Sequence, residues 1–165
     1  MPNITVKEAF EAAIGAEKAA EDFFHGLEAK FKHNHEVSLL WRQYAEDEAM
    51  HARWLEALRD KVSQEELSTF VDEHTVQLLK VVEHISVEKA LVNIHDLEDA
   101  YELVNEIENG ETNAIFCFLT DNFAADDKMR DFLRGQLNNH VARLAIDLPP
   151  QYQGAAARRK IKASA

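Results

Sequence analysis

The sequence predicts an all-α fold, a four-helix bundle with a long connection between its second and third helices. Only five glycines and three prolines occur among 165 residues, and hydrophobic residues make up 46% of the chain. Helix formers such as Ala, Glu, Leu and Lys are abundant, and apolar residues recur three and four positions apart. These three observations together favour packed amphipathic helices.

Capping residues and helix breakers divide the chain into its elements. Asn3 or Thr5 is placed to cap the first helix, and Ser86 is placed to cap the third. Ser63, with Glu66 three residues later, resembles a capping box and opens a partly helical connector that reaches residue 85. The four long helices are expected at about residues 5–32, 36–62, 86–108 and 125–146.

The second half of the chain carries two clear stops. Asn109-Gly110 ends or kinks the third helix, and residues 111–121 are expected to continue as a separate helical piece. Pro149-Pro150 ends the last helix. We therefore expect one bundle over residues 1–150 and a flexible, basic C-terminal tail over residues 151–165.

Composition excludes several classes of protein. The formal net charge of −12 argues against a partner such as nucleic acid, whose backbone requires a basic surface. No run of 18 apolar residues and no signal-peptide core occurs, so we expect neither a membrane span nor secretion. The single cysteine, Cys117, excludes an internal disulfide and is expected to pack as a small hydrophobe. A reducing cytoplasm is the expected compartment.

The apolar stripe of each long helix is interrupted by acidic or imidazole side chains. In the second helix, for example, Glu48 and His51 lie between Tyr44 and Leu55 at the spacing of a buried seam. Five such residues occur in the four helices: Glu17, Glu48, His51, Glu98 and His140. Burying an unpaired carboxylate costs several kcal/mol, on the order of the net stability of a small domain.

A metal ion would resolve the cost of burying these groups together. A cation compensates the carboxylates and accepts lone pairs from Glu and His alike. Glu48 and His51, three residues apart, project from the same side of a helix and can reach one ion or adjacent ions. Mixed oxygen and nitrogen ligands suit iron, manganese or zinc better than calcium. The alternative for each residue alone is a hydrogen-bonded core side chain.

Three segments of the sequence resemble the ferritin-like superfamily and, within it, a rubrerythrin-type domain. They are AIGAEKAAEDFFHGL around Glu17, YAEDEAMHARWLEAL around Glu48 and His51, and ALVNIHDLEDAYEL around Glu98. The resemblance covers about residues 6–144 and implies a carboxylate-bridged di-iron site. By position it implies metal ligands on the four helices in turn, namely Glu17, then Glu48 with His51, then Glu98, then His140.

The sequence departs from the family pattern on the last helix. The resemblance implies a glutamate three residues before His140, but Leu137 stands there, and Gln136 is a poorer ligand one residue away. One ion is then expected to bind well and the second weakly or not at all. Tyr101 stands where a further carboxylate is implied, with Glu102 and His95 as nearby substitutes. The rubredoxin module, which needs paired Cys-x-x-Cys motifs, is missing from these residues.

Three functions remain open on the sequence alone. The first is an oxidoreductase that acts against oxidative stress, in which iron reduces peroxide or dioxygen with electrons from a separate donor. In this function Tyr44 and Tyr101 either assist the metal ligands or only pack in the core. The second is a bundle that binds iron or zinc for storage, sensing or structure. The third is a helical protein without metal. A homodimer is a further expectation, since ferritin-like bundles often pair through helix faces.

Overall fold

The computed structural model describes residues 3–82 and 86–164, and within this part the chain is helical, with isolated bridges but no β-strands. Two long helices, α1 (Val6–Lys30) and α2 (His35–Arg59), run antiparallel along the molecule. Thr5 and Glu8 form a capping box at the start of α1, and the Asn34 side chain caps α2. The predicted all-α fold is confirmed.

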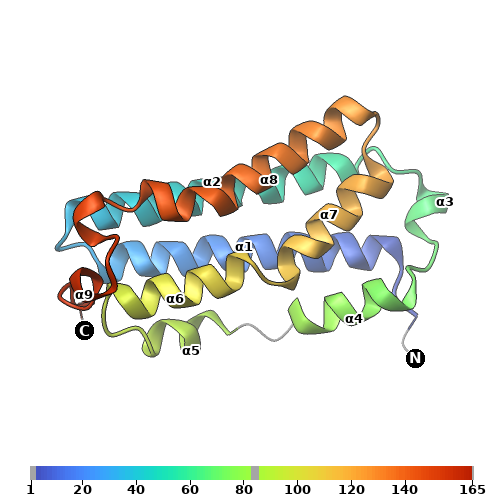
Figure 1. Cartoon of the computed structure of the whole chain (residues 1–165). Helices are drawn as coiled ribbons and strands as arrows, with labels where there is room; N and C mark the ends of the chain where they lie inside the picture. Colours follow the sequence, from blue (N-terminus) through green and yellow to red (C-terminus); the bar gives the residue numbers. More distant parts are fainter. Residues whose placement is uncertain (1–2, 83–85, 165) are drawn as a thin grey trace.

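A crossover of short helices leads from the second long helix to the third. It comprises α3 (Gln64–Leu67), α4 (Glu73–Val82) and α5 (Val87–Val92). Helix α3 lies at the end of the bundle, and α4 and α5 lie along α1 on the side away from α2 (Figure 1). The predicted capping box of Ser63 and Glu66 is present. The predicted end of the connector, residues 83–85, lies outside the described residues.

The third element of the bundle begins later than the sequence predicts. A single helix from Ser86 to residue 108 was expected, but α5 ends at Val92 and α6 (Leu97–Glu108) starts afresh with Asp96 as its N-cap. The turn between them resets which residues of α6 face the core. After the predicted break at Asn109-Gly110, α7 (Glu111–Phe123) continues the element.

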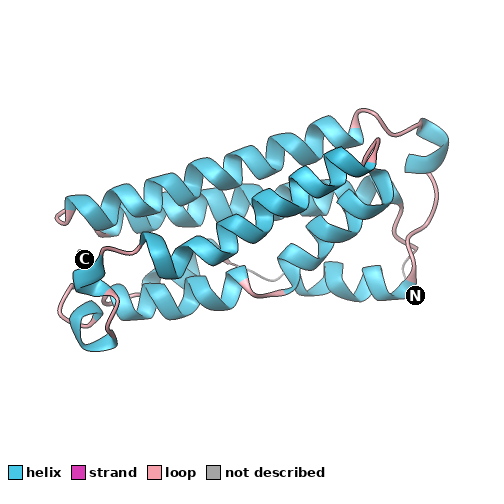
Figure 2. Cartoon of the chain, turned by 45° about the horizontal axis from the view of Figure 1, so that its top comes forward, coloured by secondary structure: helices cyan, strands magenta, loops and turns pink. Residues whose placement is uncertain are grey.

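The fourth helix, α8 (Asp127–Asp147), is capped by Asp126 and runs beside α2 (Figures 1 and 2). It is followed by a 3₁₀ turn, η1 (Pro150–Tyr152), and a last short helix, α9 (Ala155–Arg158). No described helix is both long enough and apolar enough to cross a bilayer.

The C-terminal residues pack on the bundle and do not form the free tail that was expected. Tyr152 accepts a hydrogen bond from Asn34, and the main chain of Ser164 donates to Lys30 at 2.8 Å. The buried guanidinium of Arg158 donates to Glu98. A basic composition predicted exposure, whereas the chain uses one of those basic side chains to neutralise a buried carboxylate.

The core is divided into two apolar clusters by a polar layer. One cluster is built around Phe10, Leu55 and Phe116, and the other around Phe24, Trp41 and Val104. Along each long element of the bundle, buried polar side chains lie between the residues of one cluster and the residues of the other. The polar side chains of this layer are Glu17, Glu48, His51, Glu108 and His140. The candidate site is therefore held between two rigid apolar blocks.

Candidate metal centre

Glu48 lies at the centre of the polar layer and contacts both buried histidines. Its Oε2 lies 2.9 Å from Nδ1 of His51, which is one helical turn further along α2. Its Oε1 lies 3.0 Å from Nε2 of His140 on α8. The two imidazole rings are 5.0 Å apart between centroids. One carboxylate therefore spans two imidazoles, which is the arrangement of a bridging ligand.

Two further carboxylates complete the layer, one on each side of Glu48. Glu17 on α1 lies 3.5 Å from Nδ1 of His51, and Glu108 on α6 lies 3.1 Å from Nε2 of His140. The five residues form two overlapping triads whose ligand atoms lie within 4.8 Å of one another. We call Glu17, Glu48 and His51 subsite A, and Glu48, Glu108 and His140 subsite B.

The donor set of these triads fits a transition metal. Each triad offers two carboxylates and one imidazole, the mixture that iron, manganese and zinc accept and that calcium does not prefer. The five residues are only 3% to 4% exposed, so water does not solvate them. Three buried carboxylates in contact require compensation, and a bound cation or bound protons can provide it.

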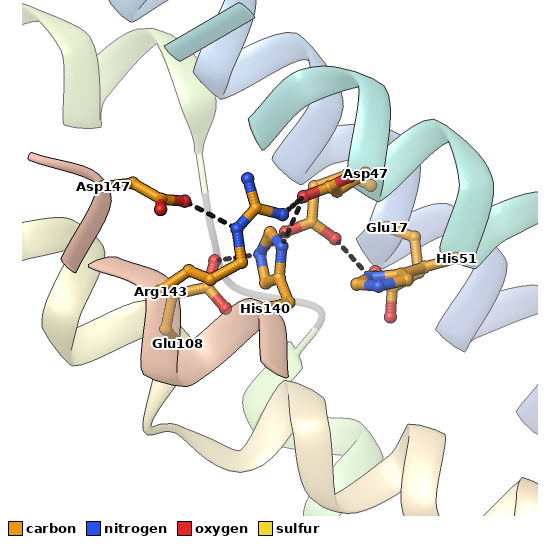
Figure 3. Close-up of polar contacts among 8 residues, drawn as sticks. Glu17, Asp47, His51, Glu108, His140, Arg143 and Asp147 are labelled. Atoms are coloured by element: carbon orange, nitrogen blue, oxygen red, sulfur yellow. Dashed lines mark hydrogen bonds and ion pairs between the residues drawn. The ribbon is translucent and has the colours of Figure 1, made fainter. Parts of the chain in front are cut away.

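Subsite B is supported by a chain of ionic hydrogen bonds that runs outward from His140 (Figure 3). Asp47 accepts from Nδ1 of His140 at 3.2 Å, and Arg143 donates to the same Asp47 oxygen at 2.8 Å. Arg143 also donates to Asp147 at 2.6 Å. A carboxylate on the far nitrogen of a histidine fixes the ring orientation and its tautomer, which leaves Nε2 for the ligand side.

In the metal-free chain, protons balance the buried carboxylates. Burial raises the pKa of Glu17 and of Glu108 despite the hydrogen bonds from the histidines. Burial alone would lower the pKa of His51, but hydrogen bonds to Glu17 and Glu48 outweigh it and raise that pKa to about 9. The pKa of His140 is raised in the same way by Asp47 and Glu108. Both imidazoles are therefore in the protonated, positively charged form at neutral pH.

Glu48 behaves differently from the two outer carboxylates. Burial would raise its pKa, yet hydrogen bonds from His140 and His51 together outweigh burial and lower it. Of the three carboxylates in the layer, Glu48 is therefore the one whose ionised form the surroundings favour. A metal ion at either subsite would take the place of these imidazole protons.

Glu98, which the sequence assigned to the site, lies elsewhere. It is buried at the start of α6, where Arg158 donates to it through Nε and, at 3.2 Å, through Nη2. It contributes to neither triad. The prediction assumed one helix from residue 86, so it continued the stripe of Leu91 and Ile94 into Glu98. The turn before Asp96 breaks that register.

Glu108 takes the position that sequence reasoning gave to Glu98. It is the last residue of α6, next to the Asn109-Gly110 break, and was interpreted only as a helix end. A signal for it does exist in the sequence, because Leu97, Val104 and Glu108 follow one another at seven and four residues. A stripe started from Leu97 instead of Leu91 would have reached it.

Three other residues were discussed for the site, and the structure shows which of them lie at the centre. Leu137 packs in the apolar cluster around Phe10 and offers no ligand. Tyr44 is fully buried with its ring 4.7 Å from the His140 ring, and its hydroxyl has no hydrogen-bond partner among the described residues. Tyr101 instead carries the Arg158 guanidinium 4.1 Å above its ring. Of the two tyrosines, only Tyr44 lies against the centre.

A small cavity of about 50 Å³ between α2 and α8 opens toward the two histidines. Its volume is on the order of one or two water molecules. It is lined by Asp47, Met50, His51, Trp54, Gln136, Asn139, His140 and Arg143. Molecules the size of water, peroxide or dioxygen match this volume.

Comparison with known proteins agrees with this geometry. The rubrerythrin family model matches residues 8–126, well over half of the chain. The match includes Glu17, Glu48, His51 and Glu108, while His140 lies beyond it. No curated protein and no solved structure gives a significant match. With a helical bundle and buried Glu/His triads that could hold metal, the chain belongs to the rubrerythrin family.

Proposed function

We propose that this chain binds two metal ions, iron first among them, at subsites A and B and uses them to reduce peroxide or dioxygen. The observation that carries the proposal is the position of Glu48, whose two oxygens face His51 and His140 at 2.9 and 3.0 Å. Each ion would be held by three side chains, with Glu48 shared. Iron, when bound, would supply the electrons that the oxidant takes up.

The chain's own residues would supply binding, orientation and exclusion of water. Asp47 would hold the His140 ring, and the two apolar clusters would keep the ligands in place. The cavity between α2 and α8 would admit a small oxidant and little else. The Tyr44 hydroxyl is buried beside His140 and has no hydrogen-bond partner in the described part of the chain, so it is placed to donate a hydrogen bond to a small polar molecule at the centre.

Turnover would require electrons from a separate protein or small-molecule donor. The 165 residues contain a single cysteine, Cys117, so they offer no paired Cys-x-x-Cys site for a second iron centre. The same cysteine count is compatible with a reducing cytoplasm, which we propose as the working compartment.

A second function, metal binding without turnover, is favoured by Leu137. This residue stands where the family pattern has a glutamate, and it removes one negative charge from the neighbourhood of His140. Loss of one carboxylate weakens the binding of a trivalent ion more than the binding of a divalent ion, because the attraction between ligand and ion grows with the charge of the ion. A chain that holds zinc, or a single iron, for storage, sensing or structure would tolerate this loss.

Metal content and peroxide consumption distinguish these functions. Purification without chelator should give two irons per chain, with near-ultraviolet absorption and consumption of peroxide when a reductant is present. One ion, or zinc alone, with no peroxide consumption would favour the binding function. No bound metal, and no change in melting temperature after addition of Fe(II) or Zn(II), would contradict both.

A further inference from the structure

The two subsites differ in how their helices are held together. Subsite A draws on α1 and α2, which are joined by a short turn and pack on each other more extensively than any other pair of described elements. Subsite B draws Glu108 from α6 and His140 from α8, which are separated in sequence by α7. Its geometry therefore depends on contacts that fix α6 and α8 relative to α2.

The C-terminal segment 150–164 supplies such contacts. It continues directly from α8, whose end is anchored by the buried Leu148. It reaches α6 through Arg158 and Glu98, and through the Leu97 main chain, which donates to Ile161 at 2.9 Å. It also reaches the start of α2, where Gln151 donates to Glu36 at 2.6 Å.

Arg158 is the centre of this segment. Its side chain is 8% exposed, donates to Glu98 and to the carbonyls of Tyr152 and Gln153, and stacks 4.1 Å above the Tyr101 ring. Removal of one partner from a buried ion pair leaves an uncompensated charge, which is strongly unfavourable. Loss of Arg158 should therefore release the segment from α6 instead of merely weakening one contact.

A displacement at Glu98 would be carried along α6 to the site. Glu98 and Glu108 lie in the same uninterrupted helix, about 15 Å apart at the helical rise of 1.5 Å per residue. His140 and Leu148 are similarly linked, about 12 Å apart along and just beyond α8. Glu108 and His140 are the two residues that subsite B adds to Glu48.

We propose that residues 150–164 form a latch whose closure is energetically coupled to metal occupancy of subsite B, with Arg158 as its positioning residue. The latch fixes α6 and α8 against α2, and thereby sets the separation of Glu108 and His140. The latch also touches the ends of α1 and α2, but these two helices pack extensively on each other, so subsite A lies outside the proposed coupling. This inference rests on the proposed function, in that it assigns an ion to each subsite.

Zn(II) titration of the full chain by calorimetry tests the coupling. In Arg158→Ala, the first Zn(II) should bind as in the wild type, while the second should bind about tenfold or more weakly, within the usual range of coupling between sites. Arg158→Lys, which keeps the charge but not the planar fork, should restore part of the second affinity. Ser63→Ala is the matched control. It removes the N-cap of α3, at the other end of the bundle, and should leave both binding steps unchanged.

Reciprocity provides a second measurement that needs no variant. If the latch favours the second ion, the second ion must stabilise the latch by the same factor. Hydrogen exchange of the Ala163 and Ser164 amides, which donate to His95 and Lys30, should slow at the second equivalent of Zn(II) and not at the first. A latch that only supports the fold would show no such step.

The outcomes separate the latch from the proposed function. If the wild-type chain takes up no second ion, the two-ion form of the proposed function is wrong and the latch proposal fails with it. If the wild type takes up two ions, and Arg158→Ala binds the second equally well or exchange at residues 163 and 164 ignores the second equivalent, the latch proposal alone is wrong.

Discussion

Oε1 of Glu48 and Nε2 of His140 lie 3.0 Å apart, although the two residues come from α2 and α8 and are separated by most of the chain. The other oxygen of the same carboxylate faces His51. Glu48 is thus the one side chain common to both triads. Substitutions at Glu48 should affect both subsites, whereas those at Glu17 or Glu108 should affect one.

The variant Glu48→Gln should lose both ions and also destabilise the metal-free fold. It keeps the shape of the side chain but removes the charge that faces two protonated imidazoles, a change that costs about 3 kcal/mol for a buried pair. Chemical denaturation of the metal-free protein and Zn(II) titration measure the two effects. The matched control is Glu46→Gln, an exposed position on the same helix, which should change neither. Retention of two tight ions in Glu48→Gln would show that this carboxylate is not shared.

The variant Asp47→Asn should weaken subsite B selectively. Asp47 accepts from Nδ1 of His140, and loss of such a carboxylate partner typically lowers metal affinity about 10- to 100-fold. Binding of one Zn(II) should be retained, because subsite A contains no contact to Asp47. Asp147→Asn serves as the control, since Asp147 pairs with Arg143 but does not touch the histidine. Equal loss of both ions in Asp47→Asn would contradict the assignment.

Metal-free and metal-loaded protein should differ in how their free energy of unfolding depends on pH. In the metal-free fold His51 keeps its proton to about pH 9, whereas the unfolded chain releases it near the ordinary pKa of 6.5. The folded state therefore binds more protons across this window, and the free energy of unfolding must fall as pH rises through it. The raised pKa values of the buried Glu17 and Glu108 act in the same direction.

The stabilisation that bound metal adds has the opposite dependence on pH, because its ligands must first lose their protons. The stabilisation by Zn(II) should therefore grow between about pH 6.5 and pH 9, the window between the ordinary and the raised pKa of His51. Melting temperatures recorded with and without Zn(II) across that range measure both slopes. Metal-free His51→Gln should show a shallower fall with pH than the wild type. Parallel slopes in the two forms would mean that the imidazoles are not the ligands.

The sequence predicted most of the site because burial of charge is visible in helical periodicity. Glu17, Glu48, His51 and His140 each interrupt an apolar stripe, and the structure brings these four together. The prediction of Glu98 as a ligand was wrong because it depended on the register of a helix. Register is lost at a turn, and sequence patterns place such a turn only to within a few residues. The same error in register explains why Glu108 was not predicted as a ligand.

The docked C-terminus shows a different limit of sequence reasoning. A run of small and basic residues resembles a frayed end, and nothing local distinguishes Arg158 from Arg159. What distinguishes them is a partner 60 residues away, Glu98, whose burial becomes visible only once the bundle is assembled. Long-range ion pairs of this kind leave no periodic trace in the sequence.

The variant Leu137→Glu should convert subsite B into a stronger site. Leu137 lies one turn before His140 on α8 and is 3% exposed, so a glutamate there would face the centre at the spacing of Glu48 and His51. In metal-free protein the added carboxylate joins three others out of water, and the free energy of unfolding should fall by about 3 kcal/mol or more. Addition of Zn(II) or Fe(II) should recover this loss and tighten the second ion.

Leu137→Gln separates charge from the loss of apolar packing. It should be destabilised in the metal-free state for want of hydrogen-bond partners, yet gain little affinity, because a neutral amide compensates no ionic charge. Calorimetric titration of the wild type and both variants gives the comparison. A second-ion affinity in Leu137→Glu no greater than that of the wild type would mean that α8 holds its side chains too far from subsite B for residue 137 to act as a ligand.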